Sequence, residues 1–307
     1  MRQGSGEAPA RAALAGNPSD GYGGRTLAVA LPALRARVQV EPSARPDVPE
    51  LLLAAALLRF VEGTGIDPGP VRMRFITMIP EQVGLAGSSA IVVAALRALA
   101  AASRVELAPG RLATLALEAE TEDLGIAAGP QDRVAQAHGG LVSMDFDARH
   151  GPHGAVQRLD PALLPPLFIA WQREPGTSSG LFHADLRRRH EEGDPIVHDG
   201  MNLLTALAAE ARDALLEGDI VNFERCMDAS FDARRAMARL DPDHVGMVEA
   251  ARALGAAANF AGSGGAIVGT LPPRVGESEL RAALPGCEVH APALVDGAGG
   301  PPQGMSG

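Results

Sequence analysis

The chain has 307 residues, of which 46% are hydrophobic and 3% aromatic, and a formal net charge of −10 at pH 7. The negative charge excludes nucleic acid as the main partner, since binders of polyanions need a basic face, and no apolar run is long enough to indicate a membrane partner. Two cysteines, Cys226 and Cys287, are too few for a disulfide framework or a tetrahedral zinc site. We therefore expect inert thiols in a cytoplasmic protein. The length and the hydrophobic content predict two domains.

The first part of the chain alternates strands and helices. A polar, glycine-rich segment at 1–7 is expected to be mobile, and a strand over 8–14 follows it. A loop rich in Gly, Asn and Asp then leads to a second strand over 25–40. A helix over 49–62 and a strand over 71–79 come next. The residues expected on the inner surface of that helix are Leu51, Leu52, Leu53, Leu57, Leu58 and Val61.

The stretch over 79–102 is a glycine-containing loop that runs directly into an apolar helix. Gly84 and Gly87 let the backbone turn its N–H groups inward, and a helix start adds unpaired donors, so the junction suits a phosphate. The plainer interpretation is an N-capped core helix, with Ser88 or Ser89 as the cap. No lysine stands near the loop, so a phosphate here would be held by backbone dipoles. The stretch alone leaves both interpretations open.

A second amphipathic helix is predicted over 109–123, and its four acids are typical of a solvated face: Glu118, Glu120, Glu122 and Asp123. After it, a Gly-Pro turn precedes Asp132, which is either a helix N-cap or a presented catalytic carboxylate. A strand over 141–146 follows. His138 and His150 show no metal-ligand spacing with other His or Cys residues, so we expect ordinary histidines.

Residues 147–166 are rich in turns and prolines, and they predict a domain boundary. The second half is expected to begin with a strand over 167–171 and to continue through a polar loop to a charged helix over 182–192. The arginine run at 187–189 indicates a solvated face, with contact to an anion as the alternative. The remaining expected elements are helices over 199–217, 219–240 and 242–257, a glycine turn over 262–265 that the plain interpretation makes a hairpin-like bend, a strand over 266–271, and a Gly/Pro tail.

Three glycine-containing motifs occur in order along the chain: APARAALAGNPSDGYGG at 8–24, PEQVGLAGSSA at 80–90 and NFAGSGGA at 259–266. Together they resemble the motifs of the GHMP kinases, small-molecule kinases named for galactose, homoserine, mevalonate and phosphomevalonate. The stretch LGIAAGPQDRVAQAHGGLVSMDF at 124–146 and the extra residue Ala86 in the second motif are similar to the glucuronokinase branch. Three ordered motifs are a more specific signal than any one of them, and the resemblance covers nearly the whole chain.

The resemblance implies an α+β, two-domain GHMP kinase fold. An N-terminal ribosomal-protein-S5-domain-2-like domain that binds ATP would span 8–152, a C-terminal ferredoxin-like α/β domain would span 153–292, and the active site would lie between them. Residues 293–307 would be a disordered tail. No feature of the sequence indicates an oligomeric state.

The resemblance also implies an ATP- and Mg²⁺-dependent sugar kinase that phosphorylates the anomeric hydroxyl of D-glucuronate to give glucuronate 1-phosphate and ADP. One alternative is a GHMP-type kinase for heptose phosphate, galactose or fucose. The other is a catalytically silent binding protein of the same fold. Retention of the full set of phosphoryl-transfer residues speaks against the silent protein.

Residue roles follow from the same resemblance. Asp132 would face the sugar hydroxyl as general base or as its orienter, and Arg11 would pair with it. Ser89 and Glu120, the latter twelve positions before Asp132, would hold Mg²⁺. The ATP phosphates would contact Gly84, Leu85, Ala86, Gly87, Ser88, Ser89 and Ala90. The substrate would contact Asn17, Ser19, Asp20, Arg133, Gly262, Gly264 and Gly265.

Phosphoryl transfer needs alignment and neutralised charge, which suits a site made of backbone donors, a metal ion and one arginine. A uronate substrate also needs a cation for its C6 carboxylate, ideally a forked one. The candidates are Arg133, Arg187, Arg234 and Arg235.

Overall fold

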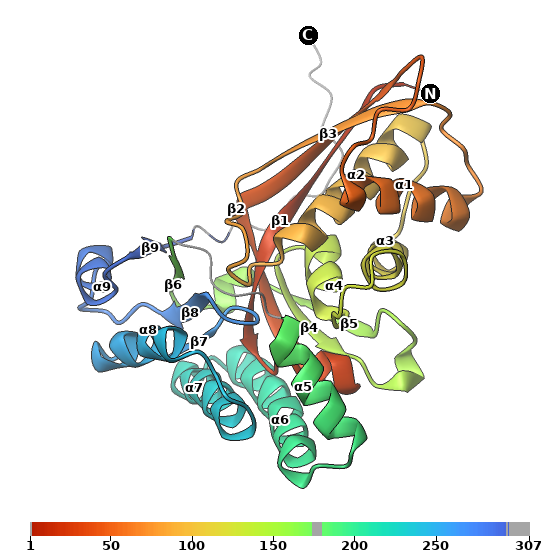
Figure 1. The fold of residues 1–307 in the computed structure, drawn as a ribbon. Helices are drawn as coiled ribbons and strands as arrows, with labels where there is room; N and C mark the ends of the chain where they lie inside the picture. The colour runs from red at the N-terminus through yellow and green to blue at the C-terminus, as the bar shows by residue number, and fades with distance from the viewer. Residues whose placement is uncertain (1, 174–179, 293, 295–307) are drawn as a thin grey trace.

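The computed structural model describes residues 2–173, 180–292 and 294. Within them the chain forms two antiparallel sheets, each with helices packed against it (Figure 1). The expected α+β class is confirmed. Most of the predicted polar loop before the charged helix and all but one residue of the predicted tail lie outside the described residues.

The first sheet is built around one long strand, β2, which pairs with three others. The first half of β2 pairs with β4 and its second half with β3, while β1 runs antiparallel along most of its length. The fifth strand, β5, pairs with the outer side of β4. The strands are β1 (Gly4–Ala15), β2 (Arg25–Pro42), β3 (Val71–Thr77), β4 (Leu141–Asp145) and β5 (Ala155–Leu159).

The first strand begins earlier than predicted. Residues 4–7 were expected to be mobile, but they belong to β1 and pair with the end of β2. Gly4 and Gly6 explain the difference, because a Cβ on them would lie 2.3 Å from the carbonyl oxygen of Ala98 and 2.2 Å from that of Ala94. The absence of side chains thus lets the strand lie directly on the helix that contains those carbonyls, a contact that no local pattern reveals.

Four helices cover the first sheet on one side (Figure 1). The second of them is buried on almost every side, as its all-round apolar sequence predicts. A single turn of π-helix (Ala119–Asp123) continues the third. The helices are α1 (Leu51–Thr64), α2 (Gly87–Ser103), α3 (Pro109–Glu118) and α4 (Gln131–His138).

The inner surface of α1 differs from the predicted one. Leu51 is 74% exposed and Leu58 is 47% exposed, so the prediction is wrong for both. The buried face consists instead of Leu53, Ala56 and Phe60, whose spacing of three and four residues follows one side of a helix.

In the described residues of the second half, the chain forms a four-stranded sheet and five α-helices. The sheet order is β7-β8-β6-β9, with all pairs antiparallel. Its strands are β6 (Leu167–Gln172), β7 (Ala258–Phe260), β8 (Ala266–Thr270) and β9 (Cys287–His290). The helices are α5 (Gly180–Glu191), α6 (Pro195–Glu217), α7 (Ile220–Met237), α8 (Pro242–Ala253) and α9 (Glu277–Ala283), and neither α9 nor β9 was predicted.

The two halves share part of their packing. The main hydrophobic core of the first sheet also includes Leu207 on α6 and Phe223 on α7, while a second core lies between the second sheet and α8 and α9. β5 lies after residue 152, so the first sheet continues past the predicted boundary, and the division into two domains stays a prediction. Cys226 and Cys287 are buried free thiols. None of the helices in the described ranges is long and apolar enough to span a membrane.

Candidate active site

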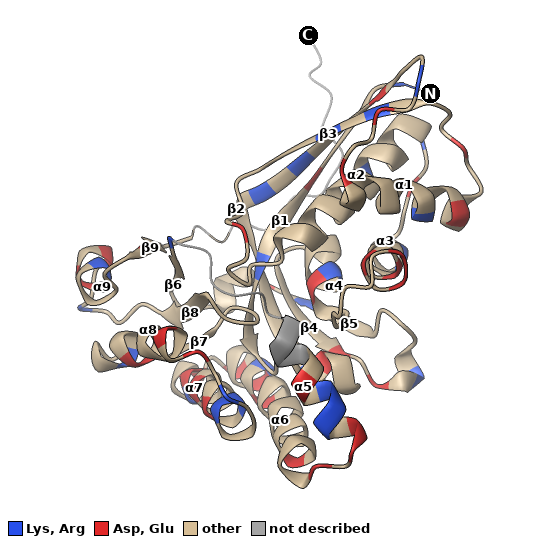
Figure 2. Cartoon of the chain, in the orientation of Figure 1, with Lys and Arg blue, Asp and Glu red and all other residues tan. Residues whose placement is uncertain are grey.

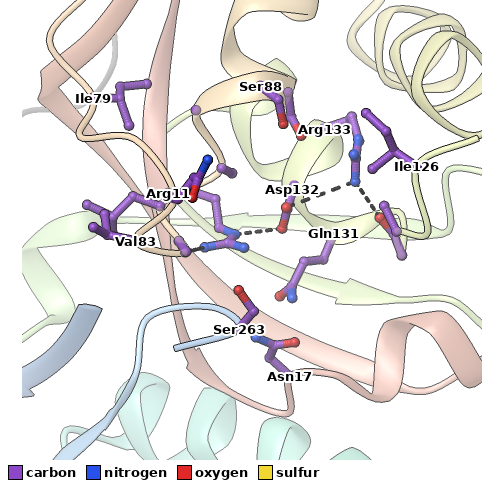
Figure 3. A pocket seen from close by; sticks show the side chains of 18 of the residues that line it. Arg11, Asn17, Ile79, Val83, Ser88, Ile126, Gln131, Asp132, Arg133 and Ser263 are labelled. Atoms are coloured by element: carbon purple, nitrogen blue, oxygen red, sulfur yellow. Dashed lines mark hydrogen bonds and ion pairs between the residues drawn. The ribbon is translucent and has the colours of Figure 1, made fainter. Parts of the chain in front are cut away.

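A cavity of about 570 Å³ lies where the three glycine-containing motifs meet. Its wall combines the loop after β1, the start of α2, the start of α4 and the hairpin between β7 and β8. In Figure 3, Arg11 and Asp132 lie in the middle of this site, with Asn17 and Ser263 on one side and Ser88 on the other. Segments far apart in the sequence therefore contribute to one site.

Arg11, on β1, connects these segments. Its side chain is almost completely buried, its Nε donates to Asp132 Oδ1 at 2.6 Å, and its Nη1 donates to the carbonyl oxygens of Gly84 and Ala261 at 2.8 Å each. One guanidinium group thus contacts the loop before α2, the side chain of Asp132 and the residue before the last glycine loop. The contact that the resemblance implies between Arg11 and Asp132 is present, and the catalytic roles of the two residues stay predictions.

The second and third glycine loops touch through their backbones. Gly84 has a φ of +78°, and a Cβ on it would lie 2.6 Å from the carbonyl oxygen of Gly264. A Cβ on Gly262 would lie 2.0 Å from the carbonyl oxygen of Gly84. Larger residues at these positions would push the two loops apart, which explains why both positions are glycine. The plain interpretation of the turn over 262–265 is also right, since it joins two antiparallel strands as a hairpin.

The first turn of α2 faces the cavity without a side-chain cap. Its N-cap is Ala86, with a φ of +60°, and no capping side chain is present among the described residues, so the interpretation of Ser88 or Ser89 as the cap is wrong. An uncapped helix start presents unpaired N–H groups and a partial positive charge. Of the residues expected at the phosphates, Ala90 is buried away from the cavity. Those that line it are Gly84, Leu85, Ala86, Gly87, Ser88 and Ser89.

Asp132 projects from the first turn of α4. The N-cap of this helix is Pro130, so the alternative interpretation of Asp132 as an N-cap is wrong. One turn after Asp132, Gln136 Nε2 donates to the carbonyl oxygen of Ala86 at 2.8 Å. Arg97, on α2, donates to the carbonyl oxygen of Gln136 at 3.2 Å. These bonds fix α4, and with it Asp132, relative to the start of α2.

Ser89 lines the cavity, and Glu120, which does not line it, lies behind this serine. Ser89 Oγ donates to Glu120 Oε1 at 3.3 Å, and Glu120 is fully buried in the π-helical turn, so the prediction of a solvated face is wrong for this acid. The other carboxylate oxygen accepts from Arg133 Nε at 2.5 Å. Arg133 also donates to the carbonyl oxygen of Gly129 at 2.7 Å. Arg133 therefore lines the cavity with a guanidinium that already has partners.

The pair of Ser89 and Glu120 fits the needs of a magnesium ion. Mg²⁺ takes oxygen ligands, and in nucleotide sites it uses one or two protein groups beside phosphates and water. A hydroxyl and a carboxylate held next to each other by a hydrogen bond are such groups. A cluster of three or more His, Cys, Asp or Glu side chains that could hold a metal by themselves is absent from the described part of the chain.

Asn17 and Asp20 line the opposite end of the cavity. Asn17 precedes a short 3₁₀ turn (Ser19–Tyr22), and Asp20 lies in it. Burial and, to a smaller extent, the nearby charge of Asp132 raise the pKa of Asp20 to about 6. Asp20 Oδ2 accepts from the backbone N–H of Gln131 at 3.2 Å. A Cβ on Gly129 would lie 2.1 Å from the same oxygen, so the Gly-Pro turn leaves the space that Asp20 occupies.

Some residues expected at the substrate do not line the cavity. Ser19 is fully buried, and its hydroxyl donates to the carbonyl oxygen of Arg25 at 2.8 Å. In the third motif, Ser263 lines the cavity, whereas the glycines shape the loop from behind. These glycines are Gly262, Gly264 and Gly265.

Several lining residues were missed by sequence reasoning. Tyr22, Gln131 and Ser263 stand within the recognised motifs, so proximity to motif residues was the available signal. The apolar wall comes from α1, β3, α2 and the segments after β3 and α3, and its assembly depends on how these distant segments pack. Its members are Leu52, Phe75, Ile79, Val83, Ile91 and Ile126.

Comparisons with known proteins identify what this chain is similar to. The family model of the GHMP kinases N terminal domain matches residues 51–140. Glucuronokinase 1 of Arabidopsis thaliana is 37% identical in an alignment 305 residues long, and this alignment covers 84% of this chain and 82% of the relative. Probable glucuronokinase 2 of the same plant is 38% identical over 306 residues, with the same coverage. The crystal structure of Lactococcus lactis galactokinase complexed with galactose superposes with a TM-score of 0.82 at 14% identity, covering 96% of this chain and 94% of that one.

Proposed function

This chain belongs to the GHMP kinase family, and on that premise we propose that it is a glucuronokinase, a phosphotransferase with an alcohol group as acceptor. It transfers the terminal phosphoryl group of ATP to the anomeric hydroxyl of D-glucuronate and produces glucuronate 1-phosphate and ADP. The observation that carries the proposal is a single cavity that holds an uncapped helix start, the pair of Arg11 and Asp132, and a polar end with Asn17 and Asp20.

ATP lies with its phosphates at the start of α2 in this proposal. The chain contains no lysine, so backbone N–H groups and the helix dipole meet the phosphate charge. The apolar wall beside the helix start, which includes Leu52, Phe75 and Ile91, suits the flat base. Ser89 and Glu120 hold Mg²⁺, which when bound supplies charge neutralisation on the phosphoryl oxygens.

Asp132 and Arg11 serve the transfer itself. The anomeric oxygen forms a bond to the terminal phosphorus while the bond from that phosphorus to its bridging oxygen breaks and ADP leaves. Asp132 accepts the hydrogen bond of the anomeric hydroxyl and takes its proton as the new bond forms. The guanidinium of Arg11, 2.6 Å from the same carboxylate, keeps it in place and offsets negative charge. Asn17 and Asp20 bind sugar hydroxyls at the polar end of the cavity.

The proposal is tested with a panel of sugars and Mg-ATP, with the products identified by proton and phosphorus NMR. The panel contains D-glucuronate, D-glucose, D-galactose, L-fucose and a heptose phosphate. We expect D-glucuronate to react far faster than the others, with the phosphate on C1. Equal rates for glucuronate and the neutral sugars would contradict the uronate assignment, and ATP binding without turnover of any sugar would indicate a silent binding protein.

A further inference from the structure

The substrate end of the cavity contains two acidic side chains. Asp20 and Asp132 both line it, and the charge of Asp132 acts on Asp20 strongly enough to raise its pKa. A sugar acid that enters this end brings a third carboxylate. Like charges at short distance repel, so binding of such a substrate requires a cation at the cavity wall.

Only an arginine that lines the cavity can contact the substrate, which limits the candidates for this cation. In the described part of the chain, three arginines line it: Arg11, Arg133 and Arg187. The guanidinium of Arg11 is bonded to Asp132 and two carbonyls, and that of Arg133 to Glu120 and a carbonyl. Arg187 has no ion pair or hydrogen bond with any described residue, so its donors are available to a ligand.

The other two arginines considered from the sequence do not reach the cavity. Arg234 is fully buried behind the third glycine loop, where it donates to the carbonyl oxygen of Gly262 at 2.6 Å. Arg235 is exposed on α7 and pairs with Glu249 on α8 at 2.7 Å. Neither residue lines the cavity.

Arg187 stands on α5 beside the polar end of the cavity, in the basic run that Figure 2 shows on this helix. Burial raises the pKa of the Tyr22 hydroxyl, and the positive charge of Arg187 acts in the opposite direction, which places the guanidinium near this lining residue. The neighbouring Arg188 is exposed and pairs with Asp185 and Glu192. Of these two adjacent arginines, only Arg187 lines the cavity.

We propose that Arg187 binds the C6 carboxylate of the sugar acid and thereby sets the preference for uronates over neutral sugars. A guanidinium presents a fork of N–H donors that matches the two oxygens of a carboxylate. The inference rests on the proposed function, because it takes the acceptor of that reaction to be a uronate.

The test compares D-glucuronate with D-glucuronamide, which has the same shape but no charge at C6. Arg187→Gln removes the guanidinium charge from an exposed position, so folding is expected to be retained. We expect kcat/KM for glucuronate to fall about 10- to 100-fold, as for the loss of a hydrogen-bonded ion pair. The KM for ATP and the kcat/KM for glucuronamide are expected to change less than about twofold. Arg187→Lys should recover part of the glucuronate activity.

Arg188→Gln is the matched control, since it makes the same change one residue along the helix, away from the cavity. It should leave the ratio of glucuronate to glucuronamide unchanged. The inference is overturned if Arg187→Gln keeps that ratio, or if it lowers both activities equally. A wild-type protein that does not phosphorylate glucuronate would instead remove the proposed function, so the two failures are distinguishable.

Discussion

Asp132 illustrates how neighbouring side chains define the role of a single residue. Its carboxylate accepts from Arg11 at 2.6 Å, and a second guanidinium, that of Arg133, lies 4.0 Å away. Two cations beside one carboxylate hold it in one orientation and offset its charge. This suits a residue that must align a hydroxyl more than it must be a strong base.

Asp132→Asn should lower kcat by about 100- to 10,000-fold, because the amide cannot take the proton of the anomeric hydroxyl. ATP affinity, measured by calorimetry, should stay within about twofold, since the nucleotide phosphates lie at the start of α2 in our proposal. Asp147→Asn is a suitable control, because Asp147 pairs only with exposed Arg149 in the described residues. Near-normal turnover of Asp132→Asn would remove Asp132 from the transfer step.

Asp20 makes stability depend on pH. Its pKa rises from 3.8 to about 6 in the folded chain, mainly through burial, so the folded state binds the proton more tightly than the unfolded state. The stability that this group contributes is complete below about pH 4 and is lost as the pH rises through about 6. At 1.36 kcal/mol per unit, the shift corresponds to about 3 kcal/mol.

Asp20→Asn should therefore raise the melting temperature of the ligand-free protein by several degrees at about pH 8, because no buried charge remains. The gain should disappear as the pH falls to about 4, where the carboxyl is neutral in both states. Scanning calorimetry at several pH values measures this difference. A gain that is the same at every pH would show that ionisation of Asp20 is not its cause.

At the scale of elements, the site depends on two loops that meet without side chains between them. The loop before α2 follows a strand of the first sheet, and the hairpin between β7 and β8 belongs to the second sheet. Gly84 and Gly262 nevertheless allow the backbones of the two loops to come into contact. Arg11 then bonds to a carbonyl in each. The close approach of the loop before α2 and the third motif therefore depends on glycine at these positions.

Gly262→Ala should lower turnover by about 100-fold, because the new Cβ would lie 2.0 Å from the Gly84 carbonyl oxygen and 3.0 Å from the Arg11 guanidinium. Gly246→Ala, in α8 with nothing within 4 Å of the new Cβ, is the matched control. It should keep full activity and gain about 0.5–1 kcal/mol of stability from helix propensity. Steady-state rates and melting temperatures check both variants, and an active Gly262→Ala would contradict the close contact.

The sequence predicts the elements whose signals are local and misses the contacts that are not. The glycine loop and apolar pattern of α2 are visible in the sequence, and so is the Gly-Pro turn before Asp132. The hydrogen bond from Gln136 to Ala86 and the position of Arg187 on the cavity wall depend on the packing of distant segments. The same reason explains why α9 and β9 were missed, since short elements carry little periodicity and are specified by what they pack against.

For the whole molecule, the identity of the basic residues matters more than the net charge. All 27 Lys and Arg positions are arginine, so every fixed side-chain cation is a guanidinium. Guanidinium groups donate to carboxylates and carbonyls in several directions at once, as Arg11, Arg97 and Arg252 all do here. The molecule therefore uses its cations as connectors between segments.

This composition predicts a clear response to chemical modification. Acylation with an amine-reactive ester has no lysine to modify, so kinase activity should be retained. Phenylglyoxal, which reacts with arginine, should inactivate the enzyme through the exposed Arg187, and glucuronate should slow this inactivation. Rates of activity loss with and without the sugar provide the measurement. Inactivation by the ester, or a rate of phenylglyoxal inactivation that the sugar does not affect, would contradict this expectation.

The bond from Arg11 to the carbonyl of Ala261 joins residues 250 positions apart. During synthesis on the ribosome, β1 leaves the exit tunnel among the first segments, whereas the third glycine loop leaves long after it. Throughout that interval the nascent chain contains a guanidinium whose second carbonyl partner has not been made. The set of contacts around Arg11 is thus completed late in translation, only after residue 261 has emerged.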